Sequence, residues 1–350
     1  YDLPNTTAYN ETCAAIANVY WNHRMFLLHG DSKYIDVLEK SLYNGLLSGI
    51  GLDGKSFFYS NAMQVKHSFN HRALEISRAG WFDCSCCPTN MARLLPSVPG
   101  YMYAQKENNI YVNLFAASTT EITVNNKPVT ILQENNYPWS GALKFVVSPK
   151  SSSDFNLMIR IPGWAENKVL PSDLYSFASA ANGAVDIKIN GEKVAYQMQK
   201  GYAVLSKRWK KGDVVEVALP MDVKLVKSNQ ILKENEGKTA VQRGPLVYCA
   251  EWVDNGGRTS NILLPSSASF NVEEKKELLN GVTVVRTSAP VIAISEDGQR
   301  VTTENKTVTL IPYYAWANRG KGEMMVWFPT RIKDMDLITT GSKLEENKSK

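Results

Sequence analysis

Hydrophobic residues recur at helical spacing between residues 14 and 46. A broad apolar stripe at residues 14–26 stops at Gly30-Asp31. A second stripe starts from Asp31 or Ser32, and glycines between residues 45 and 54 then break the chain into turns. Its apolar members, at steps of three and four, are Tyr34, Val37, Leu38, Leu42 and Leu46. The pattern predicts two helices, the first preceded by capping side chains at residues 5–7.

The pattern changes twice before residue 110. Residues 57–59 form a short apolar piece that predicts extended backbone. A further helix is expected from Asn90 to Leu95, and Pro96 must bend it or end it because proline lacks the backbone N–H that a helix interior uses. The helical part is therefore expected to occupy residues 1–105.

From Ile110 onward the apolar positions alternate with a period of two. Turn signals of the hairpin type separate the alternating runs at Asn125-Asn126 and Asn190-Gly191. A charged stretch at residues 233–238 precedes a second set of alternating runs. We expect mixed α and β structure in separate domains, with one β-sandwich at residues 106–228 and a second at 229–342. The polar end, residues 343–350, is expected to be a disordered tail.

Composition excludes several classes of protein. The chain has 350 residues, of which 44% are hydrophobic, and a net charge of +5 that no helix concentrates into a basic stripe. We therefore expect no nucleic-acid partner. No apolar run is long enough for a membrane span. The chain opens at Tyr1 without Met or a signal peptide, so residues are expected upstream, and the compartment, cytoplasmic or periplasmic, stays open.

The five cysteines are not distributed as in a disulfide scaffold. Three lie within four positions, and the total is odd. The five are Cys13, Cys84, Cys86, Cys87 and Cys249. A metal site or reactive thiols fit the cluster better, whereas Cys249 lies in an apolar run and is expected to be a buried strand residue without function. His67 and His71 have a spacing that binds zinc on a helix, but their polar setting favours a solvated loop or helix face.

Glu11, Cys13, Cys86 and Cys87 would supply the four ligands that zinc prefers. Residues two apart on an α-helix diverge by about 200°, so Glu11 and Cys13 must lie on extended backbone or at an irregular helix start. Cys86 and Cys87 are expected in a non-helical turn, which the following proline favours. Zinc would keep these thiols deprotonated, so the metal is either a structural staple or the holder of a nucleophile. The chemistry alone favours the staple.

Six segments of the chain resemble a known enzyme family. They are, in order, Tyr1-Asp2-Leu3-Pro4-Asn5, Glu11-Thr12-Cys13-Ala14, Leu42-Tyr43-Asn44, Phe57-Phe58-Tyr59-Ser60-Asn61, Trp81-Phe82-Asp83-Cys84-Ser85-Cys86-Cys87-Pro88-Thr89-Asn90 and Gln242-Arg243-Gly244-Pro245-Leu246-Val247-Tyr248. Together they are similar to the β-L-arabinofuranosidases of glycoside hydrolase family 127 and the related family 146. The resemblance covers nearly the whole chain, and its Glu-Thr-Cys and Cys-Cys-Pro motifs are specific. It reverses the preference stated above, so that the metal is expected to hold a nucleophilic cysteine and not to be purely structural.

The resemblance implies a retaining glycosidase that acts on arabinose-containing glycans of plants. It places zinc on Glu11, Cys13, Cys86 and Cys87. Cys86 would be the nucleophile, Cys84 a supporting thiol and Tyr59 part of the sugar pocket. A general acid would protonate the leaving oxygen and then activate water.

The same resemblance implies that part of the enzyme is missing from this sequence. The family's fold is an (α/α)6 barrel followed by β-sandwich domains, and residues 1–105 would be only the last part of that barrel. The family's acid/base glutamate precedes the motif at Tyr1, so this stretch by itself is expected to be inactive. An incomplete barrel would expose an apolar face, which a second copy, another chain or the missing residues would cover.

Three other interpretations remain open. A non-catalytic glycan-binding or structural module could use aromatic side chains, although each of them fits core packing better; the candidates are Trp139, Trp164, Trp209 and Trp252. A thiol redox protein could use Cys84 and Cys86, and Cys84 and Cys87 have the Cys-X-X-Cys spacing that redox pairs usually follow. A carbohydrate-active enzyme of another specificity could share the scaffold, because a fold does not fix a substrate.

Overall fold

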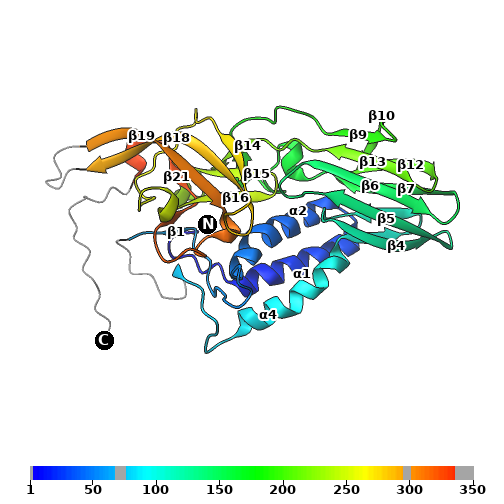
Figure 1. Cartoon of the computed structure of the whole chain (residues 1–350), viewed down its shortest axis with the longest axis horizontal. Helices are drawn as coiled ribbons and strands as arrows, with labels where there is room; N and C mark the ends of the chain where they lie inside the picture. Colours follow the sequence, from blue (N-terminus) through cyan, green and yellow to red (C-terminus); the bar gives the residue numbers. More distant parts are fainter. Residues whose placement is uncertain (1–2, 68–75, 295–300, 336–350) are drawn as a thin grey trace.

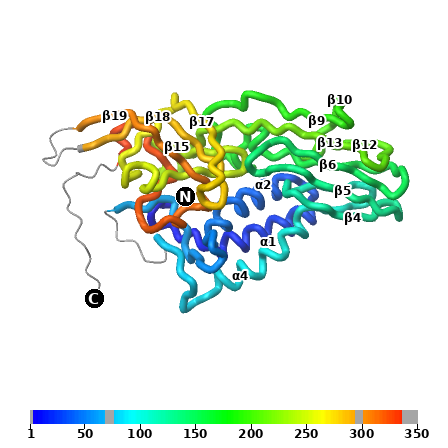
Figure 2. Tube along the Cα trace, viewed as in Figure 1, coloured from blue at the N-terminus to red at the C-terminus, as the bar shows by residue number. Residues whose placement is uncertain are grey.

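The described helices lie side by side against a set of β-sheets (Figures 1 and 2). The computed structural model describes residues 3–67, 76–294 and 301–335. Helix α1 (Thr12–His29) lies between α2 (Ser32–Lys40) and α4 (Cys86–Leu94). Helix α2 continues into a π-helical turn, η1 (Ser41–Leu46), and a 3-10 turn, η2 (Leu47–Gly49), while α4 continues into η3 (Leu95–Tyr101). None of the helices in these ranges has the length and apolar character that a membrane crossing requires.

The ends of α1 differ in how well the sequence predicts them. Gly30 ends the helix as expected, because its φ of 60° allows its N–H to bond to the carbonyl of Phe26. The start was predicted wrongly, since residues 5–7 do not cap α1. The N-cap is Glu11, and Asn5 instead donates from Nδ2 to Oδ1 of Asn235, 2.8 Å away in a distant part of the chain.

The other two helices follow their sequence signals in part. Asp31 caps α2 as predicted, since its Oδ1 accepts from the backbone N–H of Lys33 at 3.0 Å. Pro96 ends the α-helical geometry of α4, because the chain tightens to 3-10 geometry from Leu95. Helix α4, however, starts four residues earlier than the expected Asn90.

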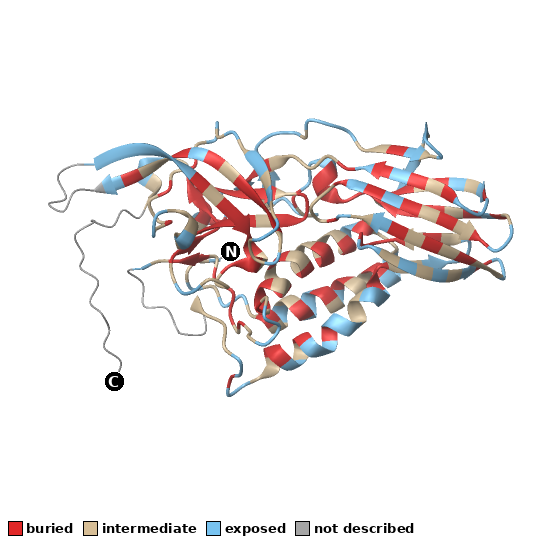
Figure 3. Ribbon diagram, in the orientation of Figure 1, coloured by how far each residue is buried: buried red, intermediate tan, exposed pale blue. Residues whose placement is uncertain are grey.

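Two sheets between residues 103 and 218 share one hydrophobic core. The first has the order β11-β12-β7-β3-β2, with β2 (Tyr103–Lys106), β3 (Asn109–Val112), β7 (Ser153–Arg160), β11 (Gln197–Gln199) and β12 (Tyr202–Trp209). The second has the order β10-β9-β13-β6-β5-β4, with β4 (Ser118–Val124), β5 (Lys127–Asn135), β6 (Ala142–Pro149), β9 (Asp186–Ile189), β10 (Glu192–Lys193) and β13 (Asp213–Ala218). Buried and exposed residues alternate along these strands (Figure 3).

The predicted hairpin turns are confirmed in these sheets. Asn125 and Asn126 have φ values of 52° and 57° between β4 and β5, which are antiparallel neighbours. Asn190 and Gly191 have φ values of 53° and 84° between β9 and β10. Asparagine and glycine tolerate positive φ at both central positions, as a two-residue hairpin turn requires.

A third sheet follows the order β17-β18-β19-β16-β15-β14-β8, with β1, β20 and β21 attached to it. Its strands are β1 (Gln64–Val65), β8 (Tyr175–Phe177), β14 (Val223–Ser228), β15 (Lys238–Arg243), β16 (Leu246–Glu251), β17 (Asn271–Lys275), β18 (Val282–Ile294), β19 (Val301–Pro312), β20 (Met324–Met325) and β21 (Phe328–Pro329). Strand β1 belongs to the helical part of the sequence and pairs with β20. The third sheet is therefore joined directly to the segment that precedes the cysteine cluster.

The predicted class of mixed α and β structure is confirmed. The finer parts, an incomplete (α/α)6 barrel with two β-sandwiches and the division at residues 105 and 228, stay predictions. The tail at residues 343–350 lies outside the described ranges. Helix α1 exposes Trp21, Leu27 and Leu28, with exposed fractions of 67%, 56% and 76%.

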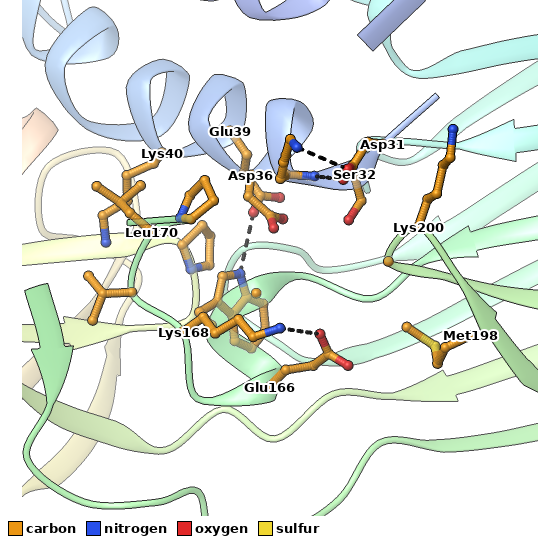
Figure 4. A pocket seen from close by; sticks show the side chains of 17 residues that line it. Asp31, Ser32, Asp36, Glu39, Lys40, Glu166, Lys168, Leu170, Met198 and Lys200 are labelled. Atoms are coloured by element: carbon orange, nitrogen blue, oxygen red, sulfur yellow. Dashed lines mark hydrogen bonds and ion pairs between the residues drawn. The ribbon is translucent and has the colours of Figure 1, made fainter. Parts of the chain in front are cut away.

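A buried polar junction connects α2 to the first sheet. Arg160, fully buried on β7, donates to Asp36 Oδ1 at 2.7 Å and to Glu39 Oε1. Glu39 also accepts from the hydroxyl of Tyr137 and, at 3.3 Å, from the indole of Trp164. A cavity of about 500 Å³ adjoins this junction (Figure 4), and it contains none of the residues of the cysteine cluster. We interpret the junction as structural because its charged groups already have protein partners.

Candidate active site

Glu11, Cys13, Cys86 and Cys87 come together in the folded chain. One potential ligand atom from each lies within 4.8 Å of all the others. Glu11 directly precedes α1, Cys13 lies in the first turn of α1, and the other two cysteines begin α4. The packing of α1 against α4 therefore builds the group from segments more than seventy residues apart.

The distances in this group fit the donor set of a tetrahedral zinc site. The sulfur of Cys87 lies 3.5 Å from that of Cys13 and 3.7 Å from that of Cys86. Glu11 Oε1 lies 3.5 Å from Cys86 Sγ and 3.9 Å from Cys87 Sγ. With Zn–S near 2.3 Å and Zn–O near 2.0–2.2 Å, tetrahedral ligand atoms are about 3.5–3.8 Å apart. Three sulfurs and one carboxylate are also a donor set that zinc accepts.

The backbone at Glu11 explains how two residues two positions apart face one point. Glu11 has φ −65° and ψ 138°, so it is extended, as the sequence analysis required. Its carboxylate does not cap α1, because it is directed to the sulfurs instead. Thr12, between the two ligand candidates, is buried and donates from Oγ1 to the carbonyl of Phe58 at 2.8 Å. This contact fixes the start of α1 below the site.

The non-helical turn expected at Cys86 and Cys87 is wrong. Both residues are in the first turn of α4, and Pro88 follows them within the same turn. The first N–H groups of a helix have no partner inside it, so proline costs little at this position. The helical start leaves Cys87 buried and Cys86 half-buried.

Electrostatics favour a cation within this group, which could hold a metal ion. Burial raises the pKa of the Cys86 thiol, and burial also raises the pKa of Cys87. A carboxylate and several thiolates cannot share so small a volume without a positive charge among them. A divalent cation, if bound, would supply that charge and would favour the thiolate form of each cysteine.

Aromatic rings line one side of the cluster. The carbonyl of Tyr59 lies 4.0 Å from Cys87 Sγ. Its ring meets those of Tyr9 and Phe82 edge to face, with centroids 5.7 Å and 6.0 Å away. A hydrogen bond with Tyr9 raises the pKa of the Tyr59 hydroxyl. Such a surface can pack against a sugar ring while its hydroxyl bonds to the sugar.

A second cavity of about 500 Å³ adjoins Glu11 on the side of α2. Asn10, Asn18 and Asn61 are among the polar residues that line it. Asn61 is buried, and within the described part of the chain its Oδ1 accepts no hydrogen bond. A hydroxyl group is the kind of donor that such an oxygen requires.

The remaining residues singled out from the sequence lie apart from the group of four or at its edge. Cys84 is exposed, and its thiol is a hydrogen-bond neighbour of Cys86. Cys249 is fully buried on β16, as expected of a strand residue. His67 is exposed in a turn, and His71 lies outside the described ranges. All five cysteines are free thiols.

The candidate tryptophans divide into two groups. Trp164 and Trp209 are buried in the core of the first two sheets, as core packing predicted. Trp139 and Trp252 are half-buried. The exposed aromatic residue nearest in sequence to the cysteines is Trp81, with an exposed fraction of 65%.

Two residues of the site were missed in the sequence analysis. Asn90 donates from Nδ2 to the sulfur of Cys13 at 3.1 Å, and Tyr9 packs against Tyr59. Asn90 was interpreted only as a helix-start signal. The sequence carried one usable signal, namely that Asn90 lies four residues after Cys86 and so shares its helix face once α4 is extended to include the cysteines.

The fold and the site define a protein of helices and sheets with a group of cysteines and one carboxylate at the helix starts, and comparison with known families agrees. Residues 1–100 match the β-L-arabinofuranosidase GH127 catalytic domain, residues 109–221 the GH127 middle domain and residues 223–329 the glycoside hydrolase family 127 C-terminal domain. The chain belongs to glycoside hydrolase family 127.

Three of the similar proteins are named as β-arabinofuranosidases or β-L-arabinofuranosidases. A non-reducing end β-L-arabinofuranosidase of Bifidobacterium longum subsp. longum is 36% identical, over 93% of this chain and 50% of its own length. A solved GH127 β-arabinofuranosidase is 46% identical with a TM-score of 0.91, over 96% of this chain and 51% of that one. A GH127 β-L-arabinofuranosidase from Geobacillus stearothermophilus T6 is 41% identical with a TM-score of 0.85, over 94% of this chain and 51% of that one. The chain spans about half the length of these relatives.

Proposed function

We propose that this protein is a retaining glycosidase that removes β-L-arabinofuranose from plant-derived glycans, with Cys86 as its nucleophile. The observation that carries the proposal is the meeting of Glu11, Cys13, Cys86 and Cys87 within 4.8 Å. Membership of family 127 and the names of the relatives supply the substrate class. The aromatic rings of Tyr9, Tyr59 and Phe82 beside the cluster support a sugar site at this place.

The four residues would divide into ligands and a nucleophile. Glu11, Cys13, Cys86 and Cys87 would hold zinc, which when bound supplies positive charge that keeps the sulfurs as thiolates at neutral pH. Cys87 is fully buried, which suits a ligand, whereas Cys86 is half-buried and reachable. Its sulfur would form a bond to the anomeric carbon as the bond to the leaving oxygen breaks.

The remaining roles follow from the same proposal. The leaving oxygen would take a proton from a general acid, and the resulting base would activate the water that releases the sugar with retention. Tyr59 would contact the sugar. We further propose that α1, α2 and α4 are the last part of an (α/α)6 barrel. The inactivity expected of this stretch by itself stays a prediction.

A comparison of two cysteine variants tests the proposal. Hydrolysis of an aryl β-L-arabinofuranoside would be measured with the intact protein, together with the anomeric configuration of the first product. Cys86→Ala should lower kcat by roughly 10³-fold or more, because loss of a nucleophile removes the main path. Cys249→Ala, fully buried on β16, is the control for loss of a thiol elsewhere.

The outcome distinguishes the proposal from its rivals. Retention in the parent, with a glycosyl adduct found on Cys86 after rapid quenching, supports it. An active Cys86→Ala variant, or inversion at the anomeric carbon, contradicts it. Turnover by residues 1–350 alone would overturn the expectation that this stretch is inactive. The same assay with other pentofuranosides tests the alternative that the scaffold has a different specificity.

A further inference from the structure

Asn90 connects the two helices of the site through its side-chain amide. It lies on α4 one turn after Cys86, and its Nδ2 donates to the sulfur of Cys13 on α1 at 3.1 Å. Its Oδ1 accepts from Nη1 of Arg93 at 2.6 Å. A guanidinium group can only donate, so the amide oxygen must face Arg93 and the amide N–H must face the sulfur. Arg93 therefore determines which end of the amide Cys13 meets.

This contact makes two of the three sulfurs inequivalent. Cys13 receives an N–H donor, whereas Cys86 Sγ faces the acceptor Glu11 Oε1 at 3.5 Å and the sulfur of Cys87 at 3.7 Å. An N–H bond to sulfur withdraws electron density and fixes the direction of the lone pairs. The bonded sulfur becomes a weaker nucleophile and a better oriented ligand.

We propose that Asn90, oriented by Arg93, is a positioning residue that keeps Cys13 as a metal ligand and leaves Cys86 as the reactive sulfur. The inference rests on the proposed function, because it explains which of three clustered thiols attacks. Burial alone does not separate Cys13 from Cys86, since both are half-buried. The hydrogen bond from Asn90 to Cys13, together with the contact of Cys86 with Glu11, is what distinguishes them.

The sharpest test is Asn90→Asp in the intact protein. This change keeps the shape of the side chain and its pairing with Arg93, but it replaces the N–H donor with an acceptor that repels a thiolate. Zinc affinity would be measured by competition with a chelator. Alkylation by iodoacetamide, in which the sulfur gains the carbamoylmethyl group and iodide leaves, would be mapped by mass spectrometry for each cysteine.

The parent is expected to bind zinc and, among the three cluster cysteines Cys13, Cys86 and Cys87, to be alkylated first at Cys86; the exposed Cys84 is outside this comparison. Asn90→Asp should bind zinc roughly 10–100-fold more weakly, as loss of an outer hydrogen-bond partner typically causes. Alkylation should then spread to Cys13 at a rate comparable with Cys86. Arg93→Gln should give a smaller change of the same kind, and it should add nothing in the Asn90→Asp background, because Arg93 acts through the amide.

The outcomes separate this inference from the function on which it rests. A parent that binds zinc and reacts at Cys86, with variants that behave identically, overturns the role of Asn90 alone. A parent that binds no zinc and shows no preference for Cys86 over Cys13 and Cys87 overturns the proposed function as well. Asn90→Leu, which removes both the donor and the acceptor, keeps the test valid if Asn90→Asp does not fold, and it should show the same spread of alkylation to Cys13.

Discussion

The sulfur of Cys86 lies 3.5 Å from Oε1 of Glu11, although 75 positions separate the two residues in the sequence. Each stands at the start of a helix, Glu11 before α1 and Cys86 in α4. The helix starts would hold these groups rigidly, since α1 and α4 pack against each other along their first turns.

Glu11→Gln should weaken zinc binding strongly. The amide keeps the shape of the carboxylate but loses its negative charge. Carboxylate oxygens are among the usual protein ligands of zinc, whereas neutral side-chain amides are not. The loss should exceed the roughly 10–100-fold that removal of an outer hydrogen-bond partner causes. Chelator competition measures it, with Glu192→Gln on the exposed strand β10 as control. Equal affinities for the two variants would remove Glu11 from the ligand set.

Gly49→Ala should disturb the start of α1, where Glu11 and Cys13 lie. A Cβ at this position would lie 2.4 Å from Cγ2 and 2.6 Å from Oγ1 of Thr12, the buried residue between Glu11 and Cys13. Thr12 cannot rotate freely because its hydroxyl bonds to the carbonyl of Phe58. We expect a loss of about 1–3 kcal/mol in unfolding free energy, together with weaker metal binding.

Gly45→Ala is the matched control for that substitution. Its Cβ would lie 3.7 Å from Ala15 Cβ, which is an ordinary contact. The unfolding midpoint in denaturant and the zinc affinity should then stay close to those of the parent. If Gly49→Ala is as harmless as Gly45→Ala, the start of α1 is not held by Thr12 in the way described.

Arg160→Met should destabilise the junction between α2 and the first sheet. The change leaves Asp36 and Glu39 without their cationic partner in a buried place. Removal of one member of a buried ion pair costs about 3–5 kcal/mol, because the other charge stays buried. Arg208→Met is the control, since Arg208 and Asp154 are exposed at 68% and 70% and their pair should contribute less than about 1 kcal/mol. Urea unfolding of both variants measures the difference, and equal losses would contradict the buried-pair account.

Lys40 should make the protein more stable as the pH rises above neutrality. Burial lowers the pKa of Lys40 from 10.5 to about 7, and its Nζ bonds to Oε1 of Gln242. Between these two pH values the unfolded chain binds a proton that the folded chain does not, so the unfolding free energy increases with pH. The increase from pH 7 to pH 9 should be about 2 kcal/mol from this group.

Lys40→Met isolates that contribution. Other groups titrate over the same interval, so the quantity to compare is the pH dependence of the parent minus that of the variant, measured by denaturant unfolding at pH 7 and pH 9. The difference should level off as the pH falls below the folded-state pKa of about 7, because only there do the folded and unfolded chains both hold the proton. A difference that is flat across this interval would show that Lys40 titrates normally.

Local signals in the sequence predict much of the fold. Gly30 and Asp31 mark one helix end and the next helix start, and the pairs at residues 125–126 and 190–191 mark two hairpins, because each signal depends on the conformational preferences of adjacent residues. Long-range pairing is not encoded in this way. Nothing near Arg160 in sequence indicates that its partners are Asp36 and Glu39, 124 and 121 positions away.

The candidate site shows the same contrast between local signals, which the sequence reveals, and long-range contacts, which it does not. Residue type alone picked out Glu11, Cys13, Cys86 and Cys87, because soft sulfur ligands and a carboxylate suggest a metal. The local conformation at Cys86 was predicted wrongly, since proline is tolerated in a first helical turn. The contact of Asn90 with Cys13 spans 77 positions and depends on the packing of α1 against α4, which the sequence pattern does not reveal.

The most direct test of the account is the zinc content of the purified protein, measured together with the number of titratable thiols before and after chelation. The account predicts one zinc per chain and about three thiols released by the chelator, one for each of Cys13, Cys86 and Cys87. Substitution of Cys86 should reduce the number released by one. A protein without zinc, whose cluster thiols react freely before any chelator is added, would contradict the four-residue site and the nucleophile that it is proposed to hold.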